Sequence, residues 1–396
     1  MRSESGNEIL GGVPAMLEEG RISAFQAMIY QISMMLATLI LFTPGVAAMK
    51  ARGDAWLSIF PALLLGFMAV FIATRLALRF PEQTVVEYTP RVLGAFFGKL
   101  IGFIYVFYFF FLMYYVQRQF GELMSTSYFP LTPNIVLIAL LTLLAAYMVY
   151  MGLEVICRVA LIWGVFVPAF FLLFALIAKD IEVGNFQPVL EHGIGPVVAG
   201  SFLPGATFTE AAVVVLILLP FIGDKRRALG AGLAAVTGVC VLFAVVLIGA
   251  IGMMGAETTG RLMFPGFTLY RRMHVEALPV LDRQDALYMA IWVGGMLLKL
   301  ATFFHAGMLS LGQWLGFKSH RPLILPVGAL VTALGIQAWG NVTELADFAA
   351  QGVPFFILFI TIVLPVILLL AAVLRKMRDD PAAGGEKRAS APDKKA

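Results

Sequence analysis

The fold is decided by the stretch Ser201-Phe-Leu-Pro-Gly-Ala-Thr-Phe-Thr-Glu210, which places Pro204 and Gly205 together inside a long apolar segment. Proline removes a backbone donor, and glycine favours unwinding of a helix. Directly afterwards, Thr207 to Glu210 matches the Ser/Thr-x-x-Glu capping box, in which each side chain satisfies a free N–H group at a helix start. The stretch therefore predicts a helix that stops and restarts inside a membrane.

The composition around this stretch is that of a helical membrane protein. Of the 396 residues, 60% are hydrophobic and only 13% are charged, whereas a soluble domain carries about 25% charged residues. Segments such as 135–150 are apolar on all sides and lack the alternation of barrel strands. The sequence contains no phosphate-binding Gly-rich loop, Ser/His/Asp set, paired carboxylates or metal-ligand spacing. We therefore expect an all-α membrane protein that is not an enzyme and uses no cofactor or metal.

Ten apolar windows are long enough to cross a hydrocarbon layer of about 30 Å. They lie near residues 23–48, 55–78, 99–123, 133–152, 155–178, 200–222, 229–254, 286–314, 321–340 and 352–374. Lysine and arginine are concentrated on the side of the termini, which favours N-in and C-in topology and speaks against a nucleic-acid-binding patch. We expect a cytoplasmic segment at 1–21, a ten-helix transporter-like domain at 22–375 and a disordered cytoplasmic tail at 376–396.

Ten spans divide into five plus five, and interruptions in corresponding spans are the sequence sign of an inverted-repeat transporter. Pro204 and Gly205 supply the interruption in span six. The matching place in span one is Met34 to Pro44, where the signal is weaker because no glycine precedes Pro44. The pattern predicts broken helices one and six.

Lys299 is the strongest candidate for a functional ionisable group, because a charge near mid-bilayer costs roughly 2.5 to 3.5 kcal/mol on insertion scales. It belongs to a small or polar stripe of span eight that must face protein, formed by Trp292, Gly295, Lys299, Thr302 and Ala306. One interpretation places its ammonium in the position of a coupling cation, or has it move a proton. The other makes it a structural lysine bonded to carbonyl groups that a broken span one has freed.

Other polar groups carry weaker signals. Glu210 either caps the restarted helix or contacts a ligand amine. Span three shows one amphipathic face suited to a wet or ligand-lined cavity, made of Tyr105, Tyr108, Leu112, Tyr115, Gln119 and Glu122. The pairs Arg118/Glu122 and Glu154/Arg158 have the i,i+4 spacing of structural ion pairs. The amphipathic piece from Phe267 to His274 is either a gating cap over the mouth or a solvated surface helix.

Many short pieces in a fixed order give the chain a resemblance to a known family. They are Ile22-Ser-Ala-Phe-Gln26, Phe80-Pro-Glu-Gln-Thr-Val-Val-Glu-Tyr88, Gly152-Leu-Glu-Val-Ile-Cys-Arg158, Phe202-Leu-Pro-Gly-Ala-Thr-Phe208, Phe264-Pro265, Trp292 to Lys299 and Arg321-Pro-Leu-Ile-Leu-Pro326. Together, over about residues 22–375, they resemble the spore germination permease (GerAB-type) family of the amino acid-polyamine-organocation superfamily.

The resemblance implies a LeuT/APC-like fold with ten transmembrane helices in a 5+5 inverted repeat, with spans one and six broken around a central site. It implies a site at the span-one bend and the span-six break, namely Ala37, Thr38, Leu39, Pro204, Gly205, Ala206 and Thr207, and we add Tyr108 from span three. Relatives commonly carry Gly-x-Gly where this chain has Ala37-Thr-Leu39, and the bulky leucine favours a small ligand.

Three functions follow as hypotheses. The resemblance implies a subunit that senses a nutrient germinant, usually an amino acid, together with a larger membrane subunit and a lipoprotein subunit in the inner spore membrane. Lys299 as a coupling group instead favours a proton-coupled amino acid permease in the cell membrane. A scaffold or ion path that binds no specific ligand is the third.

Overall fold

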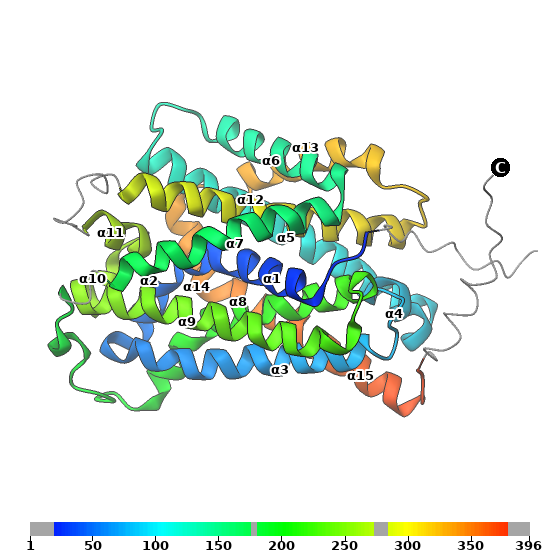
Figure 1. Cartoon of the computed structure of the whole chain (residues 1–396), viewed down its shortest axis with the longest axis horizontal. Coiled ribbons are helices and arrows are strands. Elements are labelled where there is room, and N and C mark those ends of the chain that lie inside the picture. The colour runs from blue at the N-terminus through cyan, green and yellow to red at the C-terminus, as the bar shows by residue number, and fades with distance from the viewer. Residues whose placement is uncertain (1–19, 176–179, 273–283, 379–396) are drawn as a thin grey trace, which may run out of the picture.

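The computed structural model describes residues 20–175, 180–272 and 284–378, and in these ranges the chain is a bundle of helices (Figure 1). The α-helices are α1 (Ala24–Leu39), α2 (Thr43–Ala51), α3 (Ile59–Ala77), α4 (Val85–Leu93), α5 (Ala95–Ser127), α6 (Asn134–Met151), α7 (Leu153–Ala175), α8 (Ile194–Leu218), α9 (Ala228–Met254), α10 (Ala256–Arg261), α11 (Pro265–Arg272), α12 (Gln284–Leu315), α13 (Ile324–Gln337), α14 (Val342–Leu358) and α15 (Leu364–Leu374). The expected all-α class is confirmed.

Seven helical runs in the described ranges are long and apolar enough to cross a membrane. They are Thr43–Ala77, Ala95–Ser127, Asn134–Met151, Ile194–Phe221, Lys225–Met254, Tyr288–Leu315 and Val342–Leu374. The run Ile194–Phe221 is the central one, because 94% of its most apolar window is buried inside the protein. The chain is therefore an integral membrane protein, while the count of ten spans remains a prediction.

The last predicted span begins earlier than expected. The window at 352–374 lies within a helical run that starts at Val342, where the Asn341 side chain accepts a hydrogen bond of 2.9 Å from the Glu344 N–H. Glu344 and Asp347 lower the hydropathy of the first turns, so an apolar window misses them. A short π-helical segment, Phe359–Val363, joins α14 to α15.

The first predicted span is broken, as expected, but slightly later than predicted. The α1 helix continues through Ala37, Thr38 and Leu39, and the turn comprises residues 40–42 before α2 starts at Thr43. The Leu41 N–H donates to the Thr38 carbonyl over 3.3 Å, which closes the last turn of α1. Pro44 stands in the first turn of α2, where a missing N–H costs nothing.

The predicted break in span six is wrong, because α8 runs without interruption from Ile194 to Leu218 with Pro204 inside it. Thr207 does not cap a new helix. Its hydroxyl donates 3.2 Å back to the Leu203 carbonyl, one turn earlier. In a membrane interior every unpaired backbone group is costly, so the helix keeps its remaining hydrogen bonds around one proline.

Gly205 has a packing role in place of the predicted conformational one. A Cβ at this position would lie 2.7 Å from Leu65 Cδ1 and 3.4 Å from the Ala62 Cα of α3. On the facing side, a Cβ at Gly66 would lie 2.9 Å from the Phe208 Cβ. The two glycines thus let α3 and α8 approach closely, which is the usual use of small residues between membrane helices.

The short helix α11 covers the break between α1 and α2. Its Pro265, Gly266, Phe267, Leu269 and Tyr270 are buried, so a solvated surface helix is excluded for the part the structure describes. His274, at the end of the predicted piece, lies outside the described residues. Both ends of the described chain lie at the opposite end of the bundle, drawn at the right in Figure 1, where Ile22 bonds to Phe221 and Arg79 bonds to Met377.

Candidate ligand-binding site

A buried cluster of three polar side chains joins α1, α8 and α12. The Lys299 ammonium donates to Thr38 Oγ1 over 2.6 Å and to Glu210 Oε2 over 2.8 Å. The three residues are 2%, 7% and 3% exposed, so none of them is a surface group. The acceptors are side-chain oxygens, which corrects the expectation that a structural lysine here would bond to freed carbonyls.

The position of Thr38 places this cluster next to the helix break. Thr38 lies in the last turn of α1, and its carbonyl accepts the turn hydrogen bond from Leu41. Glu210 lies in the middle of α8, and Lys299 lies near the middle of α12. Each charged group therefore comes from a continuous helix, while the hydroxyl comes from the helix that ends.

A second contact fixes α12 against the end of α1. The Trp292 indole N–H donates to the Ala37 carbonyl over 2.9 Å, and its ring stacks on Phe120 at 5.9 Å between centroids. A Cβ at Gly295 would lie 3.1 Å from the Ala37 Cβ, so the two backbones run close together. The predicted protein-facing stripe of span eight is confirmed, because Trp292, Lys299, Thr302 and Ala306 are all buried.

The buried environment makes the Lys299–Glu210 ion pair sensitive to the loss of either partner. Removing one partner of a buried pair leaves an uncompensated charge and costs about 3 to 5 kcal/mol, whereas the intact pair contributes little net stability. Its effect is therefore mainly on geometry, because Glu210 and Lys299 hold α8 and α12 at one separation. Any group that replaces Lys299 beside Glu210 must also bring a positive charge.

Aromatic rings border the cluster on the side of α5. The Phe303 ring lies 5.6 Å from Lys299 Nζ, within the range of a cation–π contact. Tyr108 meets Phe303 edge-on at 6.4 Å, and its buried hydroxyl has no hydrogen-bond partner among the described residues. The six residues of the predicted span-three face are all buried.

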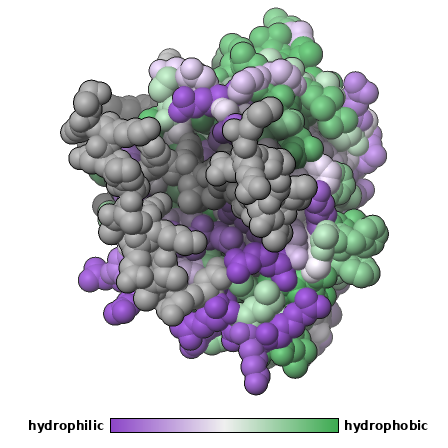
Figure 2. All heavy atoms as spheres, turned by 90° about the vertical axis from the view of Figure 1, so that its right-hand side faces the viewer, coloured by the Kyte–Doolittle hydropathy of each residue, from purple (hydrophilic) through white to green (hydrophobic). Residues whose placement is uncertain are grey.

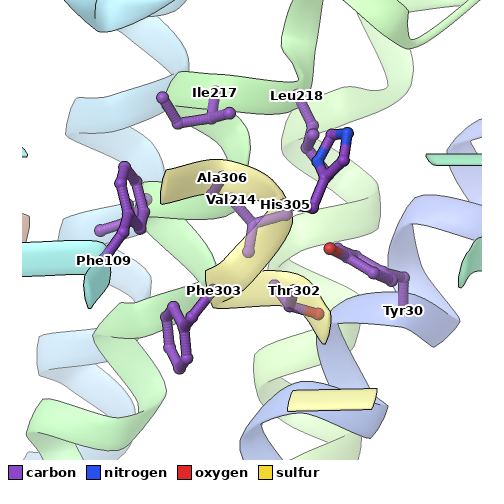
Figure 3. Close-up of a pocket in the computed structure, with 10 residues that line it drawn as sticks. Tyr30, Phe109, Val214, Ile217, Leu218, Thr302, Phe303, His305 and Ala306 are labelled. Atoms are coloured by element: carbon purple, nitrogen blue, oxygen red, sulfur yellow. The ribbon is translucent and has the colours of Figure 1, made fainter. Parts of the chain in front are cut away.

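A small cavity of about 10 Å³ lies beside this cluster (Figure 3). Figure 3 shows Tyr30 of α1, Val214 of α8, Phe109 of α5 and Thr302 of α12 around it. A cavity of about this volume holds a single water molecule. In this structure the Lys299 ammonium satisfies the Thr38 hydroxyl and the Glu210 carboxylate directly.

The predicted site residues separate into two groups. Ala37, Thr38 and Lys299 come together, Leu39 is buried at the end of α1, and Tyr108 lies one aromatic ring away. The four residues of the predicted break belong to α8, where Gly205 faces α3 and the Ala206 carbonyl accepts from Thr209. Pro204 and Thr207 are buried in the same continuous helix.

The sequence predicts that Glu210 either caps a helix or contacts a ligand amine, and the capping role is wrong. Its carboxylate contacts an ammonium group, that of Lys299. The signal was available, because Glu210 and Lys299 are opposite charges in the middle of two spans, and such charges pair. By contrast, no feature of the sequence indicates the hydrogen bond of 2.8 Å that the Thr361 hydroxyl donates to Thr209 Oγ1.

The helix arrangement is that of secondary transporters with the LeuT-like fold. The solved structure of MhsT in complex with L-phenylalanine superposes with a TM-score of 0.64 at 12% identity, over 90% of this chain and 99% of that one. A Na⁺-coupled sialic acid symporter in a substrate-bound outward-open state superposes with a TM-score of 0.60 at 11% identity, over 87% of this chain and 80% of that one. At these identities the likeness shows the fold alone.

Sequence comparison then gives the family. Residues 21–339 match the spore permease family, described as spore germination protein, and the chain belongs to it. It is 28% identical to spore germination protein KB of Bacillus subtilis (strain 168), over 93% of this chain and 99% of that protein. It is 26% identical to spore germination protein YndE of the same organism, over 90% and 97%. The resemblance noted in the sequence is confirmed.

Proposed function

We propose that this chain is the subunit of a spore germinant receptor that senses a nutrient, with an amino acid bound where α1 ends. The observation that carries the proposal is the buried cluster of Thr38, Glu210 and Lys299 at the helix break. Family membership supports the role in germination, and the fold, shared with a transporter solved with L-phenylalanine, supports an amino acid as ligand.

The geometry offers complementary places for a zwitterion. The N-terminal end of α2 favours a carboxylate, because the positive end of the helix dipole lies there. Glu210 offers a carboxylate for the ligand ammonium, in competition with Lys299. In the structure the Lys299 ammonium occupies this place. A ligand that exchanges with it releases the link between α8 and α12 and shifts the population toward another arrangement.

The proposed site comprises the residues expected from the sequence together with one addition. Ala37, Thr38 and Leu39 form the last turn of α1 before the break, Tyr108 lies against Phe303, and Glu210 is added from α8. Pro204, Gly205, Ala206 and Thr207 act through the shape of α8. The signal then passes to a larger membrane subunit and a lipoprotein subunit in the inner spore membrane, with both termini of this chain in the cytoplasm.

Thermal unfolding of the purified protein with a panel of amino acids tests ligand binding. One ligand at about 100 times its Kd should stabilise the fold by about 2.7 kcal/mol. Glu210→Gln should abolish this shift. Glu122→Gln is the matched control, because Glu122 is a buried acid paired with Arg118 at 2.7 Å and is not part of the site. It should lower the unfolding temperature and keep the ligand-induced shift.

Deletion of the gene tests the biological role. Spores without it should lose the response to one nutrient and keep the response to others. Normal germination on every nutrient, or a protein that no amino acid stabilises, would contradict the proposal.

A proton-coupled amino acid permease is the second candidate, favoured by the buried Lys299–Glu210 pair, which could exchange a proton during transport. Purified protein in liposomes distinguishes the two. A sensor binds its ligand without uptake under a proton gradient, whereas a permease accumulates it and loses uptake in Lys299→Met. Binding without uptake rejects the permease, and binding of any kind rejects a scaffold with no ligand.

A further inference from the structure

A second candidate site lies far from the helix break, at the end of the bundle where both ends of the described chain meet. A groove of about 440 Å³ opens between the last turns of α3 and α15. We call it the α3–α15 groove. Its lining combines three arginines with four apolar residues: Arg75, Arg79, Arg378, Phe71, Leu78, Leu369 and Val373. No acidic residue lines it in the described ranges.

Two of the three arginines are held in place by contacts that leave their charge in the groove. The Arg75 guanidinium lies 4.9 Å from the centre of the Phe71 ring, and Arg79 donates to the Met377 carbonyl over 3.1 Å. Among the described residues none of the three forms an ion pair with a carboxylate. Other arginines do, because Arg227 pairs with Asp224 and Arg261 pairs with Glu257. Within residues 20–175, 180–272 and 284–378, the groove therefore carries uncompensated positive charge.

The apolar wall of the groove continues onto the surface that faces lipid. Phe71 is 46% exposed and Val373 is 45% exposed, and Leu370 and Leu374 extend the same apolar surface on α15. Figure 2 looks onto this end of the bundle, where hydrophilic residues gather and hydrophobic ones border them. Such a border of hydrophilic and hydrophobic surface at the end of a membrane bundle suits the boundary between lipid headgroups and hydrocarbon.

We propose that the α3–α15 groove binds an anionic phospholipid, with its phosphate between the guanidinium groups and an acyl chain along Phe71 and Val373. Guanidinium groups match phosphate oxygens in charge and in bidentate geometry. Basic pockets between membrane helices are a recurrent form of lipid headgroup site. A free phosphate would satisfy the arginines and leave the apolar wall unused, so the combination favours a lipid.

The competing explanation is structural. Both α3 and α15 end here, and basic side chains near helix C-termini bond to the last carbonyls and oppose the dipole, as Arg79 does at Met377. A purely structural role predicts that loss of the arginines lowers stability equally in every lipid. A lipid site predicts that the loss appears only when an anionic lipid is present.

The experiment uses the purified full chain in nanodiscs of phosphatidylcholine with increasing phosphatidylglycerol, and native mass spectrometry to count retained lipid. The test variant is Arg75→Gln/Arg79→Gln/Arg378→Gln. The matched control, Arg226→Gln/Arg227→Gln/Lys318→Gln, removes the same charge from other segments expected on the same side. Each arginine that lines the groove should contribute about fivefold in affinity, and none of the three control residues lines it. We expect the test variant to lose phosphatidylglycerol binding by tenfold or more and the control by less than threefold.

A second variant separates lipid from free phosphate. Leu369→Trp fills the apolar part of the groove and keeps all three arginines, so it should weaken phosphatidylglycerol binding. Added inorganic phosphate should change lipid binding neither in the parent protein nor in Leu369→Trp. Melting in pure phosphatidylcholine checks that each variant is folded. The proposal would be overturned if the test and control variants lost phosphatidylglycerol binding equally. It would also be overturned if the parent protein retained phosphatidylcholine as well as phosphatidylglycerol, or if inorganic phosphate displaced the bound lipid.

Discussion

The predicted spans one and six are expected at corresponding places in two halves of the chain, yet only one of them is broken in the structure. Span six has a proline and a glycine in sequence, Pro204 and Gly205, and forms one helix. Span one has neither at its turn, residues 40–42, and divides into α1 and α2. The residues best known for ending helices therefore do not mark the break in this conformation.

The neighbours explain the difference. The glycine that accommodates the break in span one belongs to another segment, because a Cβ at Gly266 of α11 would lie 2.0 Å from the Ile40 carbonyl oxygen. Gly205 has the converse role: it makes room for the Leu65 side chain of α3 at a place where its own helix, α8, is intact. A glycine thus marks a close approach of two segments, and its own helix need not end there.

The largest effect is expected where the two spans are linked, at Lys299. Lys299→Met leaves Glu210 charged and buried without its partner, which should cost about 3 to 5 kcal/mol of unfolding free energy. Adding Glu210→Leu should restore most of that loss, because both charges are then gone. Thermal unfolding of the purified variants measures both effects.

The control for this prediction is the ion pair between Lys225 and Glu82, which is partly exposed. Lys225→Met should cost less than about 1 kcal/mol, since solvent replaces the lost partner. If Lys299→Met unfolds at the parent temperature, Lys299 and Glu210 do not hold α8 and α12 together.

The next effect compares the two glycines. Gly266→Ala would force a methyl group against a backbone carbonyl, which cannot move without displacing the turn, and should cost about 3 kcal/mol. Gly205→Ala meets the flexible end of Leu65 at 2.7 Å and should cost about 1 kcal/mol. Chemical or thermal unfolding gives the order. A larger loss of stability in Gly205→Ala than in Gly266→Ala would mean that the α3–α8 contact is tighter than the contact of α11 with the span-one turn.

Much of the fold was predictable because apolar length and charge distribution act along the chain. Within the described residues a helix lies at each expected span, and the pairs Arg118/Glu122 and Glu154/Arg158 form as the i,i+4 spacing predicts. The α1–α2 break was located to within one turn. The error at Pro204 arose because a proline lowers helix stability locally, while packing against α3 and the low polarity of the interior favour an intact helix.

The site was predictable only in part, for a related reason. Lys299 and Thr38 were identified from their own chemistry and from family resemblance. That the Glu210 carboxylate lies 2.8 Å from Lys299 Nζ depends on how α8 and α12 are placed, and 89 residues separate the two in sequence. The α3–α15 groove joins residues even farther apart, and no local pattern in the sequence indicates it.

The smallest effect concerns the two prolines, and it has opposite signs in the two spans. Pro204→Ala restores a backbone donor to the continuous helix α8 and should stabilise the protein by about 1 kcal/mol. Pro44→Ala, in the first turn of α2, should destabilise it by about 0.5 kcal/mol, because proline there already has the right backbone angle and restricts the unfolded chain. Unfolding temperatures of the two variants, measured side by side, give the signs. Destabilisation by Pro204→Ala would mean that span six is interrupted in the dominant conformation. If Pro204→Ala instead stabilises the protein and abolishes the germinant response, α8 must open at this position for function.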